Sequence, residues 1–334
     1  MIGAAMNGLG VRARMALVDL ICHLLAGRGI APPERAGLRD DLRLAGFRRA
    51  ARAFVLRRLT GGHRGEGAPI LTSALDGALP LFVSAGDAAV GREILETGIY
   101  EPHLVALYRR LVKPGMTVVD IGANIGFHAL HAALLVGPGG RVIAIEPDPR
   151  NAALLRLSLA ISPAPPPVEL IEAALSDAGG TILMSDLGNP GNSGARFTHR
   201  DRALLERLVH GAAPSFRSVP ALRWDDHRFD TPIDLVKIDV EGSEPQALRG
   251  MERSLRRHRP ILIAEFAPAN LQSIGGIEPD GFLRFIEELG YDIAVVETGG
   301  SADPPDAAGA RAAIEARLRG RHHVDLLCTV RGPA

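Results

Sequence analysis

The residues with the clearest chemical potential lie in a short stretch, residues 118–127, with the sequence VVDIGANIGF. Two valines precede Asp120, and two glycines, Gly122 and Gly126, interrupt the run before an apolar segment begins at Phe127. This order predicts a buried strand, a tight bend and the start of a helix. Glycines in such a bend let backbone N–H groups approach a ligand at the helix N-terminus. The stretch therefore predicts a nucleoside-binding crossover.

Two acidic residues indicate which nucleoside fits this bend. Asp120 ends the strand, where a carboxylate repels a pyrophosphate and attracts an amino group; the spacing D-x-G-x-N-x-G, which includes Asn124, differs from the G-x-G-x-x-G of dinucleotide sites. Glu146 ends the next apolar run, residues 142–145, where it can accept hydrogen bonds from both ribose hydroxyls. A ligand with a ribose, an ammonium group and no phosphate is S-adenosylmethionine, the cofactor that we predict. The alternative is an ordinary Rossmann-like turn whose acids cap helices.

The composition fits a cytoplasmic enzyme without a nucleic-acid partner. The 334 residues include 38 basic and 38 acidic side chains, so the sequence has no electrostatic footprint for a polyanion. The apolar segment 15–27 contains Asp19 and His23 and is too short to span a bilayer, so we expect an amphipathic helix and no stable membrane insertion. Cys22 and Cys328 lie far apart, in a predicted helix and a predicted strand, which favours reduced thiols over a disulfide.

The chain is expected to divide into an N-terminal helical region, residues 1–66, and a larger α/β region, residues 67–334, with its core at 116–330. Apolar residues at helical spacing predict the N-terminal helices. Two apolar runs around the dipeptide 76–77, Asp-Gly, predict a β-hairpin over residues 69–84.

From residue 116 onward, strand and helix patterns alternate, which predicts a doubly wound, Rossmann-like and mostly parallel sheet. The expected strands are 116–120, 141–146, 168–173, 233–241, 260–266, 291–297 and 324–330, with the last two at the sheet edge. The expected helices are 88–97, 102–111, 127–135, 150–160, 201–210, 244–257, 279–289 and 308–318. A glycine- and asparagine-rich loop interrupts the pattern between 187 and 220, and such an insertion either borders the substrate site or is a surface loop.

A second group of charged residues lies in the fourth expected strand. Alternation places Lys237, Asp239 and Glu241 on one face, and charges in a buried strand need partners or a ligand. Because ligands bind outside the carboxyl ends of the strands, Asp239 and Glu241 are expected to line the cleft. The alternative is a structural network in which both acids only neutralise Lys237. Ser243 is expected to cap the next helix, with Gln246 completing a capping box.

Together, these motifs resemble the FkbM family of S-adenosylmethionine-dependent methyltransferases. The resemblance covers roughly residues 70–330, and its most diagnostic part is 237–244. The segments that carry it are 76–77, 98–101, 119–126, 146–147, 237–244, 248–250 and Glu265. It implies a seven-stranded sheet with an antiparallel edge strand. It also implies O-methylation of hydroxyl groups on sugars, glycans or polyketide-type natural products.

We predict that donor binding involves Glu101, Asp120, Gly122, Asn124, Gly126 and Glu146. The longer 187–220 insertion and the N-terminal region depart from the commoner form of the family, so the acceptor is left open. Two other functions are considered. A nicotinamide-dependent oxidoreductase is disfavoured by the absence of G-x-G-x-x-G, and a catalytically inactive donor-binding module is disfavoured because all the cleft acids are present.

An alkyl hydroxyl is a poor nucleophile at neutral pH, so a general base is expected. Asp239 and Glu241 are the leading candidates, and His128, in the first turn after the glycine bend, is the third. His227 is a weaker candidate. A divalent metal held by Asp239 and Glu265 is conceivable, but carboxylates without a recognisable ligand spacing support a metal poorly, and we predict none.

Overall fold

The computed structural model describes residues 69–84, 86–161, 167–186, 194, 196–208, 215–300 and 307–331. Within these bounds the chain forms two compact units, one ending at Tyr100 and the other beginning at Glu101. The predicted N-terminal helices and the boundary between residues 66 and 67 lie outside the described residues. That division of the chain therefore stays a prediction.

The first unit contains the predicted hairpin. Strands β1 (Pro69–Ala74) and β2 (Leu79–Ser84) pair antiparallel, with Ala74 opposite Leu79. The turn between them is a short 3-10 segment, Leu75–Gly77, in which Asp76 (φ +55°) and Gly77 (φ +95°) take left-handed conformations that suit an Asp-Gly pair. Helix α4 (Val90–Thr97) follows and ends at Gly98.

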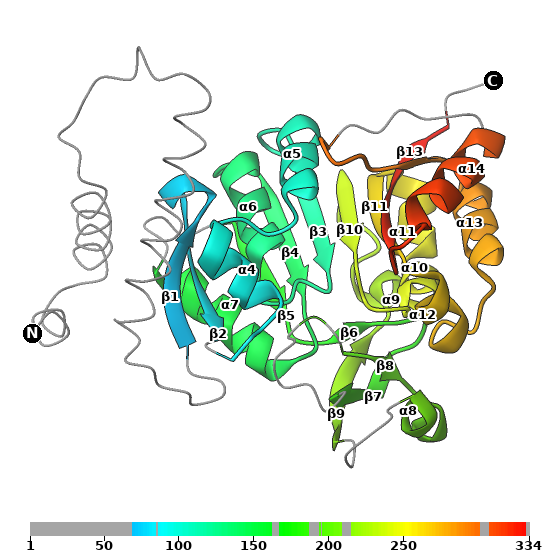
Figure 1. The fold of residues 1–334 in the computed structure, drawn as a ribbon, viewed down its shortest axis with the longest axis horizontal. Coiled ribbons are helices and arrows are strands. Elements are labelled where there is room, and N and C mark those ends of the chain that lie inside the picture. Colours follow the sequence, from blue (N-terminus) through cyan, green and yellow to red (C-terminus); the bar gives the residue numbers. More distant parts are fainter. Residues whose placement is uncertain are drawn as a thin grey trace, which may run out of the picture. The chain divides into compact units, whose positions relative to one another are not determined.

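The second unit is built on a seven-stranded sheet with the order β12-β13-β11-β10-β3-β4-β5 (Figure 1). All neighbouring strands from β11 to β5 run parallel, while β13 is antiparallel to both β11 and β12. The predicted doubly wound α/β fold is thus confirmed. The strands are β3 (Thr117–Ile121), β4 (Arg141–Ile145), β5 (Val168–Ile171), β10 (Leu235–Ile238), β11 (Ile261–Phe266), β12 (Tyr291–Val295) and β13 (Val324–Val330).

One detail of the predicted sheet needs correction. The antiparallel strand, β13, is not the edge strand but lies one position inside it, with β12 at the edge. β13 has a hydrogen-bonding partner on each side, because residues 324–328 pair with β11 and residues 326–330 pair with β12.

The helices pack beside the two halves of the sheet. Figure 1 shows α6 and α7 beside β3, β4 and β5, and α10 to α13 beside the other half. The predicted helix 244–257 is broken at Met251 into α10 and α11. The helices are α5 (Pro102–Leu111), α6 (Phe127–Val136), α7 (Pro149–Ile161), α10 (Glu244–Gly250), α11 (Glu252–His258), α12 (Pro268–Ser273), α13 (Pro279–Glu288) and α14 (Ala307–Leu318). The largest hydrophobic cluster lies in this unit and includes the fully buried Trp224, Phe282 and Tyr291.

The fourth expected strand is shorter than predicted, which changes the position of one candidate residue. β10 ends at Ile238, and the chain turns at Glu241 (φ +54°) and Gly242 (φ +99°). The Oε1 atom of Glu244 accepts hydrogen bonds from the N–H groups of Val240 (2.9 Å) and Gly242 (3.2 Å) and so holds the turn. Glu241 is therefore placed by a turn, and not by strand alternation with Lys237.

The predicted capping box at the start of α10 is wrong. Ser243 occupies the N-cap position, but its side chain makes no capping hydrogen bond. Its Oγ atom donates instead to the carbonyl of Thr198 (3.0 Å), and the Gln246 amide donates to the carbonyl of Gly275 (3.1 Å). Tertiary partners from two other segments have replaced the local ones.

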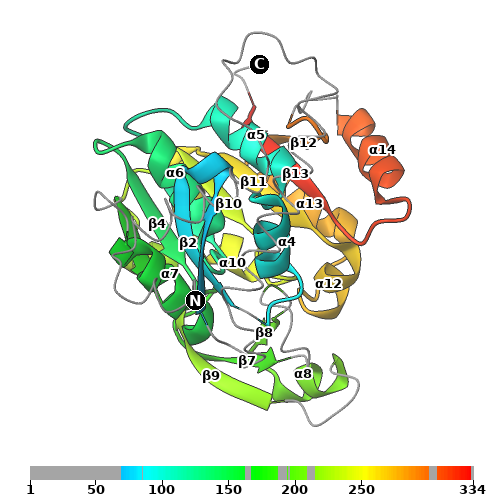
Figure 2. The same ribbon diagram turned by 60° about the vertical axis from the view of Figure 1, so that its left-hand side comes forward.

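The 187–220 insertion belongs to a second, smaller sheet that the sequence analysis did not predict. Its order is β6-β9-β7-β8, and it lies below the central sheet in the views of Figures 1 and 2, together with α8. The polar helix expected at 201–210 is confirmed as α8 (Arg202–Leu208). The other elements are β6 (Ala174–Leu175), β7 (Gly180–Asp186), β8 (Thr198–His199), β9 (Ser215–Leu222) and α9 (Trp224–His227).

Two contacts show which end of the central sheet the insertion borders. Arg196 Nη1 lies 2.5 Å from Oδ2 of Asp148, a residue that comes three positions after β4. Thr198 in β8 contacts Ser243, which follows β10. Both partners lie beyond the carboxyl ends of central strands. The insertion therefore borders the end of the sheet where ligands bind in such folds.

Candidate active site

The glycine bend follows β3 directly and is packed against two other elements. Gly122 (φ +79°), Asn124 (φ +52°) and Gly126 (φ +90°) all have left-handed backbones. A Cβ atom on Gly122 would lie 1.9 Å from the carbonyl oxygen of Asp239, and one on Gly126 would lie 2.2 Å from the side chain of Leu155. The N–H groups of both glycines donate to backbone carbonyls. The glycines thus serve close packing, and the resulting bend sets the position of Asn124.

Glu146, predicted as the last residue of its strand, lies directly after β4, and its carboxylate is held by the backbone. Oε2 accepts a hydrogen bond from the N–H of Asn124 (2.8 Å), and Oε1 accepts one from the N–H of Asp148 (2.8 Å). The side chain is buried, and burial raises its pKa to about 7 against the opposing effect of these hydrogen bonds. Glu146 and the glycine bend therefore form one rigid unit.

Lys237 lies between two of the candidate acids. Its Nζ atom is 3.1 Å from Asp239 Oδ2 and 3.8 Å from Asp120 Oδ1. Burial lowers the pKa of Lys237, but Asp239 and Asp120 outweigh it, and the pKa is raised well above its ordinary value. Asp120 is fully buried, and neither of its carboxylate oxygens has a hydrogen-bond partner among the described residues. Burial raises the pKa of Asp120, while Lys237 opposes this.

Glu101 and His128 form a second polar pair. Glu101 has a left-handed backbone (φ +46°) immediately before α5, and its Oε2 atom is 2.8 Å from His128 Nε2. Burial, followed by the charges of Asp325 and Asp239, raises the pKa of Glu101 to about 8. Burial, followed by Lys237, lowers the pKa of His128 to about 4. At neutral pH both shifts favour a protonated carboxyl that donates to a neutral imidazole.

Two further acids belong to this region: Glu241 lies beyond the end of β10, and Glu265 lies in β11. Glu241 accepts a hydrogen bond from the Asn270 amide (3.1 Å), and burial, followed by Asp239 and Glu244, raises its pKa to about 8. Glu265 lies 3.6 Å from His323, and burial, followed by Asp239, raises its pKa well above the ordinary value. These acids therefore repel each other and hold protons more tightly than isolated carboxylates do.

The structure gathers most of the predicted site residues. Glu101 contacts His128, and Lys237 lies between Asp120 and Asp239. Glu146 accepts a hydrogen bond from the N–H of Asn124. His227 lies in α9 and is exposed. Three contributors to the site were not predicted from the sequence: Asn270, Tyr108, whose ring lies 5.5 Å from that of His128, and the His103–Asp325 pair. Only the polar residues around the start of the last strand, Arg321, His322, His323 and Asp325, could have indicated the last of these.

The charge balance of this site fits S-adenosylmethionine. The ion pairs in the described part of the chain supply Asp120 and Asp239 with one shared ammonium group, while Glu101 and Glu265 have only imidazole partners. A ligand with ammonium and sulfonium groups would supply positive charge to these buried acids, and its ribose hydroxyls could use the remaining lone pairs of Glu146. Within the described ranges, no group of three or more His, Cys, Asp or Glu side chains could hold a metal ion.

Comparisons with known proteins agree with this chemistry. Residues 120–293 match the model of the methyltransferase FkbM domain. Methyltransferase sdnD of Sordaria araneosa is 29% identical over 198 residues, which cover 53% of this chain and 73% of that protein. The 31-O-demethyl-FK506 methyltransferase FkbM of Streptomyces tacrolimicus is 32% identical over 201 residues, covering 53% and 74%.

A crystal structure of methyltransferase FkbM from Methylobacillus flagellatus KT is 14% identical, with a TM-score of 0.40, and the match covers 94% of this chain and 60% of that one. In the part of the chain described here, no helix is long and apolar enough to cross a membrane. With the glycine bend, Glu146 and the cleft acids all inside or beside the matched region, the chain belongs to the FkbM methyltransferase family and uses S-adenosylmethionine as its methyl donor.

Proposed function

We propose that this methyltransferase methylates a hydroxyl oxygen of a small molecule of the sugar, glycan or polyketide type. The relative from Streptomyces tacrolimicus is named as an O-demethyl-FK506 methyltransferase, which supports oxygen as the acceptor atom. S-Adenosylmethionine supplies an electrophilic methyl group when bound. The protein must then orient the hydroxyl in line with that methyl group and remove the hydroxyl proton.

Glu241 is the general base in this proposal, and its placement is the observation that carries it. The residue follows the end of β10 in a left-handed backbone conformation, a strained geometry that is concentrated at functional sites. Its pKa of about 8 gives it a proton affinity close to that needed near neutral pH. Asn270, which donates a hydrogen bond to the carboxylate, fixes its orientation.

The other acids have supporting roles in the proposal. Asp239 is partly exposed and paired with Lys237, so it is suited to orienting the acceptor hydroxyl. Glu101, Asp120, Gly122, Asn124, Gly126 and Glu146 form the donor side. His128 is buried behind Glu101, and we assign it the role of a positioning residue that keeps this carboxyl in place.

The test uses the full chain, labelled S-adenosylmethionine and a panel of hydroxyl compounds, with the methylated atom identified by NMR. Glu241→Gln should lower kcat about 10²- to 10⁴-fold, because the base is lost, and leave the affinity for S-adenosylhomocysteine unchanged. Glu278→Gln, which changes an exposed carboxylate on another segment, is the control and should behave like the unmodified protein.

Two outcomes would contradict the proposal. Methylation at nitrogen or sulfur would remove the hydroxyl acceptor. Normal turnover of Glu241→Gln, combined with a large loss in Asp239→Asn, would transfer the role of the base to Asp239. If Asp239→Asn instead melts early but retains turnover per folded molecule, Asp239 belongs to the structural network around Lys237.

A further inference from the structure

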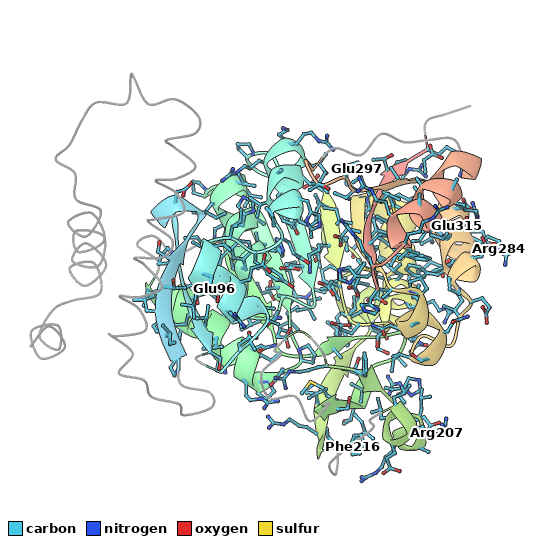
Figure 3. All side chains as sticks on the ribbon, in the orientation of Figure 1. Glu96, Arg207, Phe216, Arg284, Glu297 and Glu315 are labelled. Carbon is cyan, nitrogen blue, oxygen red and sulfur yellow. The ribbon has the colours of Figure 1, made fainter. Side chains whose placement is uncertain are left out.

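A cavity of about 390 Å³ lies next to the candidate active site. Its lining carries mainly basic side chains, whereas the active site is rich in acids. The cavity forms where β12 ends and β13 begins. Because β13 runs antiparallel, this is the same edge of the sheet as the carboxyl ends of β10 and β11. Two segments beside the cavity can be found in Figure 3 by a labelled residue: the segment after β12 by Glu297, and α14 by Glu315. Its polar lining consists of His103, Thr298, Arg317, Arg321, His322, His323 and Asp325.

The lining has more positive than negative groups. Arg317 is paired with Glu297, and His103 Nε2 lies 2.6 Å from Asp325 Oδ2. Arg321, in contrast, forms no ion pair with any residue that the structure describes. It lies close enough to act on His103, whose pKa is raised mainly by the hydrogen bond to Asp325, an effect that the charge of Arg321 opposes in part. The Arg321 guanidinium is therefore the cation that is left for a ligand.

Residues that line the cavity also lie against the acids Glu265 and Glu101 of the candidate active site. Asp325 lies opposite Glu265 in the β11–β13 register, and His323 Nδ1 is 3.6 Å from Glu265 Oε1. On the α5 side, the charges of Asp325 and His103 both act on the Glu101 carboxyl. A single molecule could therefore present a hydroxyl to the acids and place another group in the cavity.

We infer that this cavity binds an anionic group of the methyl acceptor, a carboxylate or a phosphate, with Arg321 as the principal contact. A guanidinium donates paired hydrogen bonds to either group, and the surrounding imidazoles add further donors. The inference rests on the proposed O-methylation and narrows the acceptor to a hydroxylated compound with an acidic group. A neutral acceptor would leave Arg321 unused.

The test measures binding to the full chain saturated with S-adenosylhomocysteine, by calorimetry at constant ionic strength. Three probes of similar size are compared: methyl glucuronide, glucose 6-phosphate and the neutral methyl glucoside. We expect at least one charged probe to bind about tenfold or more tightly than the neutral one, and the tighter of the two identifies the acidic group. Arg321→Ala should abolish this preference, and Arg321→Lys should retain part of it.

Arg284→Ala provides a matched control, because Arg284 is an exposed arginine on α13, away from the cavity lining. It should bind all three probes like the unmodified protein. Equal binding of charged and neutral probes, no binding of any probe below about 10 mM, or an unchanged preference in Arg321→Ala would each overturn the inference. Arg321-dependent binding together with methylation at nitrogen would instead contradict the proposed function and leave the anion site standing.

Discussion

The two halves of the central sheet hold their carboxylates in different ways. On the β3–β4 side, Glu146 accepts hydrogen bonds from two backbone N–H groups, those of Asn124 and Asp148. On the β10–β11 side, Glu241 accepts a hydrogen bond from a side-chain amide, and Glu265 has an exposed imidazole 3.6 Å away. Glu146 is thus fixed by the main chain, whereas Glu241 and Glu265 depend on side chains.

This difference matches what each half has to do. A donor that is the same in every turnover is best bound by groups that do not reorganise, and backbone N–H groups meet this requirement. A base must gain and lose a proton, which calls for a carboxyl whose pKa lies near the working pH, as that of Glu241 does. We infer that the β3–β4 half is preorganised for the donor and that the β10–β11 half responds to the acceptor.

The largest expected effect comes from disrupting the contact between the two halves of the sheet. They meet at Gly122, where a Cβ atom would lie 1.9 Å from the carbonyl oxygen of Asp239. Gly122→Ala should therefore destabilise the protein by about 3 kcal/mol or more, since a positive φ and a backbone clash act together. Thermal or urea unfolding would measure the change in the free energy of unfolding.

Gly115→Ala is the matched control for this prediction. Gly115 has a similar φ (+86°), but nothing lies within 4 Å of its would-be Cβ atom. Its substitution should cost only the conformational strain, about 1–3 kcal/mol. If the two variants unfold at the same denaturant concentration, the close approach of β10 to the glycine bend does not matter for stability.

A substitution with a smaller effect should test whether the β3–β4 half serves the donor and the β10–β11 half serves the acceptor. Glu146→Gln replaces a carboxylate with an amide, which weakens the acceptor for the ribose hydroxyls and places an NH₂ group against a backbone N–H. Loss of a charged hydrogen bond should weaken S-adenosylhomocysteine binding by about 1.5–3 kcal/mol, while kcat at saturating donor changes little. Calorimetry and initial rates measure the two quantities. A fall in kcat without a change in affinity would show that the two halves are not functionally distinct.

The geometry of the β3–β4 half could be predicted from the sequence because its signals are local. Asp120 and Glu146 each end or follow an apolar run, and strand, bend and helix follow one another within 20 residues. The start of β10 was likewise apparent. Its end was not, because the turn at Glu241 is held by Glu244 and packed against Asn270, and neither contact has a signature in the strand pattern.

The remaining features depend on contacts between distant segments. His103 and Asp325 pair across 222 positions, and Ser243 and Thr198 across 45. The β7–β9 pairing likewise joins segments that are separated in the sequence by β8 and α8, and the apolar positions in β9 are interrupted by polar ones. Only the folded chain brings these residues together, so periodicity and spacing could not reveal them.

The smallest expected effect concerns stability and pH. The pKa values of Glu101 and Glu241 are raised to about 8, and that of Glu146 to about 7, from an ordinary value of 4.5. A carboxyl with a raised pKa in the folded state stabilises fully below about pH 4.5 and loses this contribution as the pH rises through the folded value. His128, whose pKa is lowered to about 4, acts in the opposite direction, but only below about pH 6.5.

The ligand-free protein should therefore lose stability between pH 6.5 and pH 8.5, and Glu241→Gln should lose less, because one of the groups that release a proton has been removed. Relative to the unmodified protein, this variant should be more stable at pH 8.5 than at pH 6.5. Urea unfolding at several pH values measures the slopes, with Glu278→Gln as the exposed control. Parallel stability curves for the two variants would mean that Glu241 does not hold its proton near neutral pH, and the case for Glu241 as the base would then pass to Asp239.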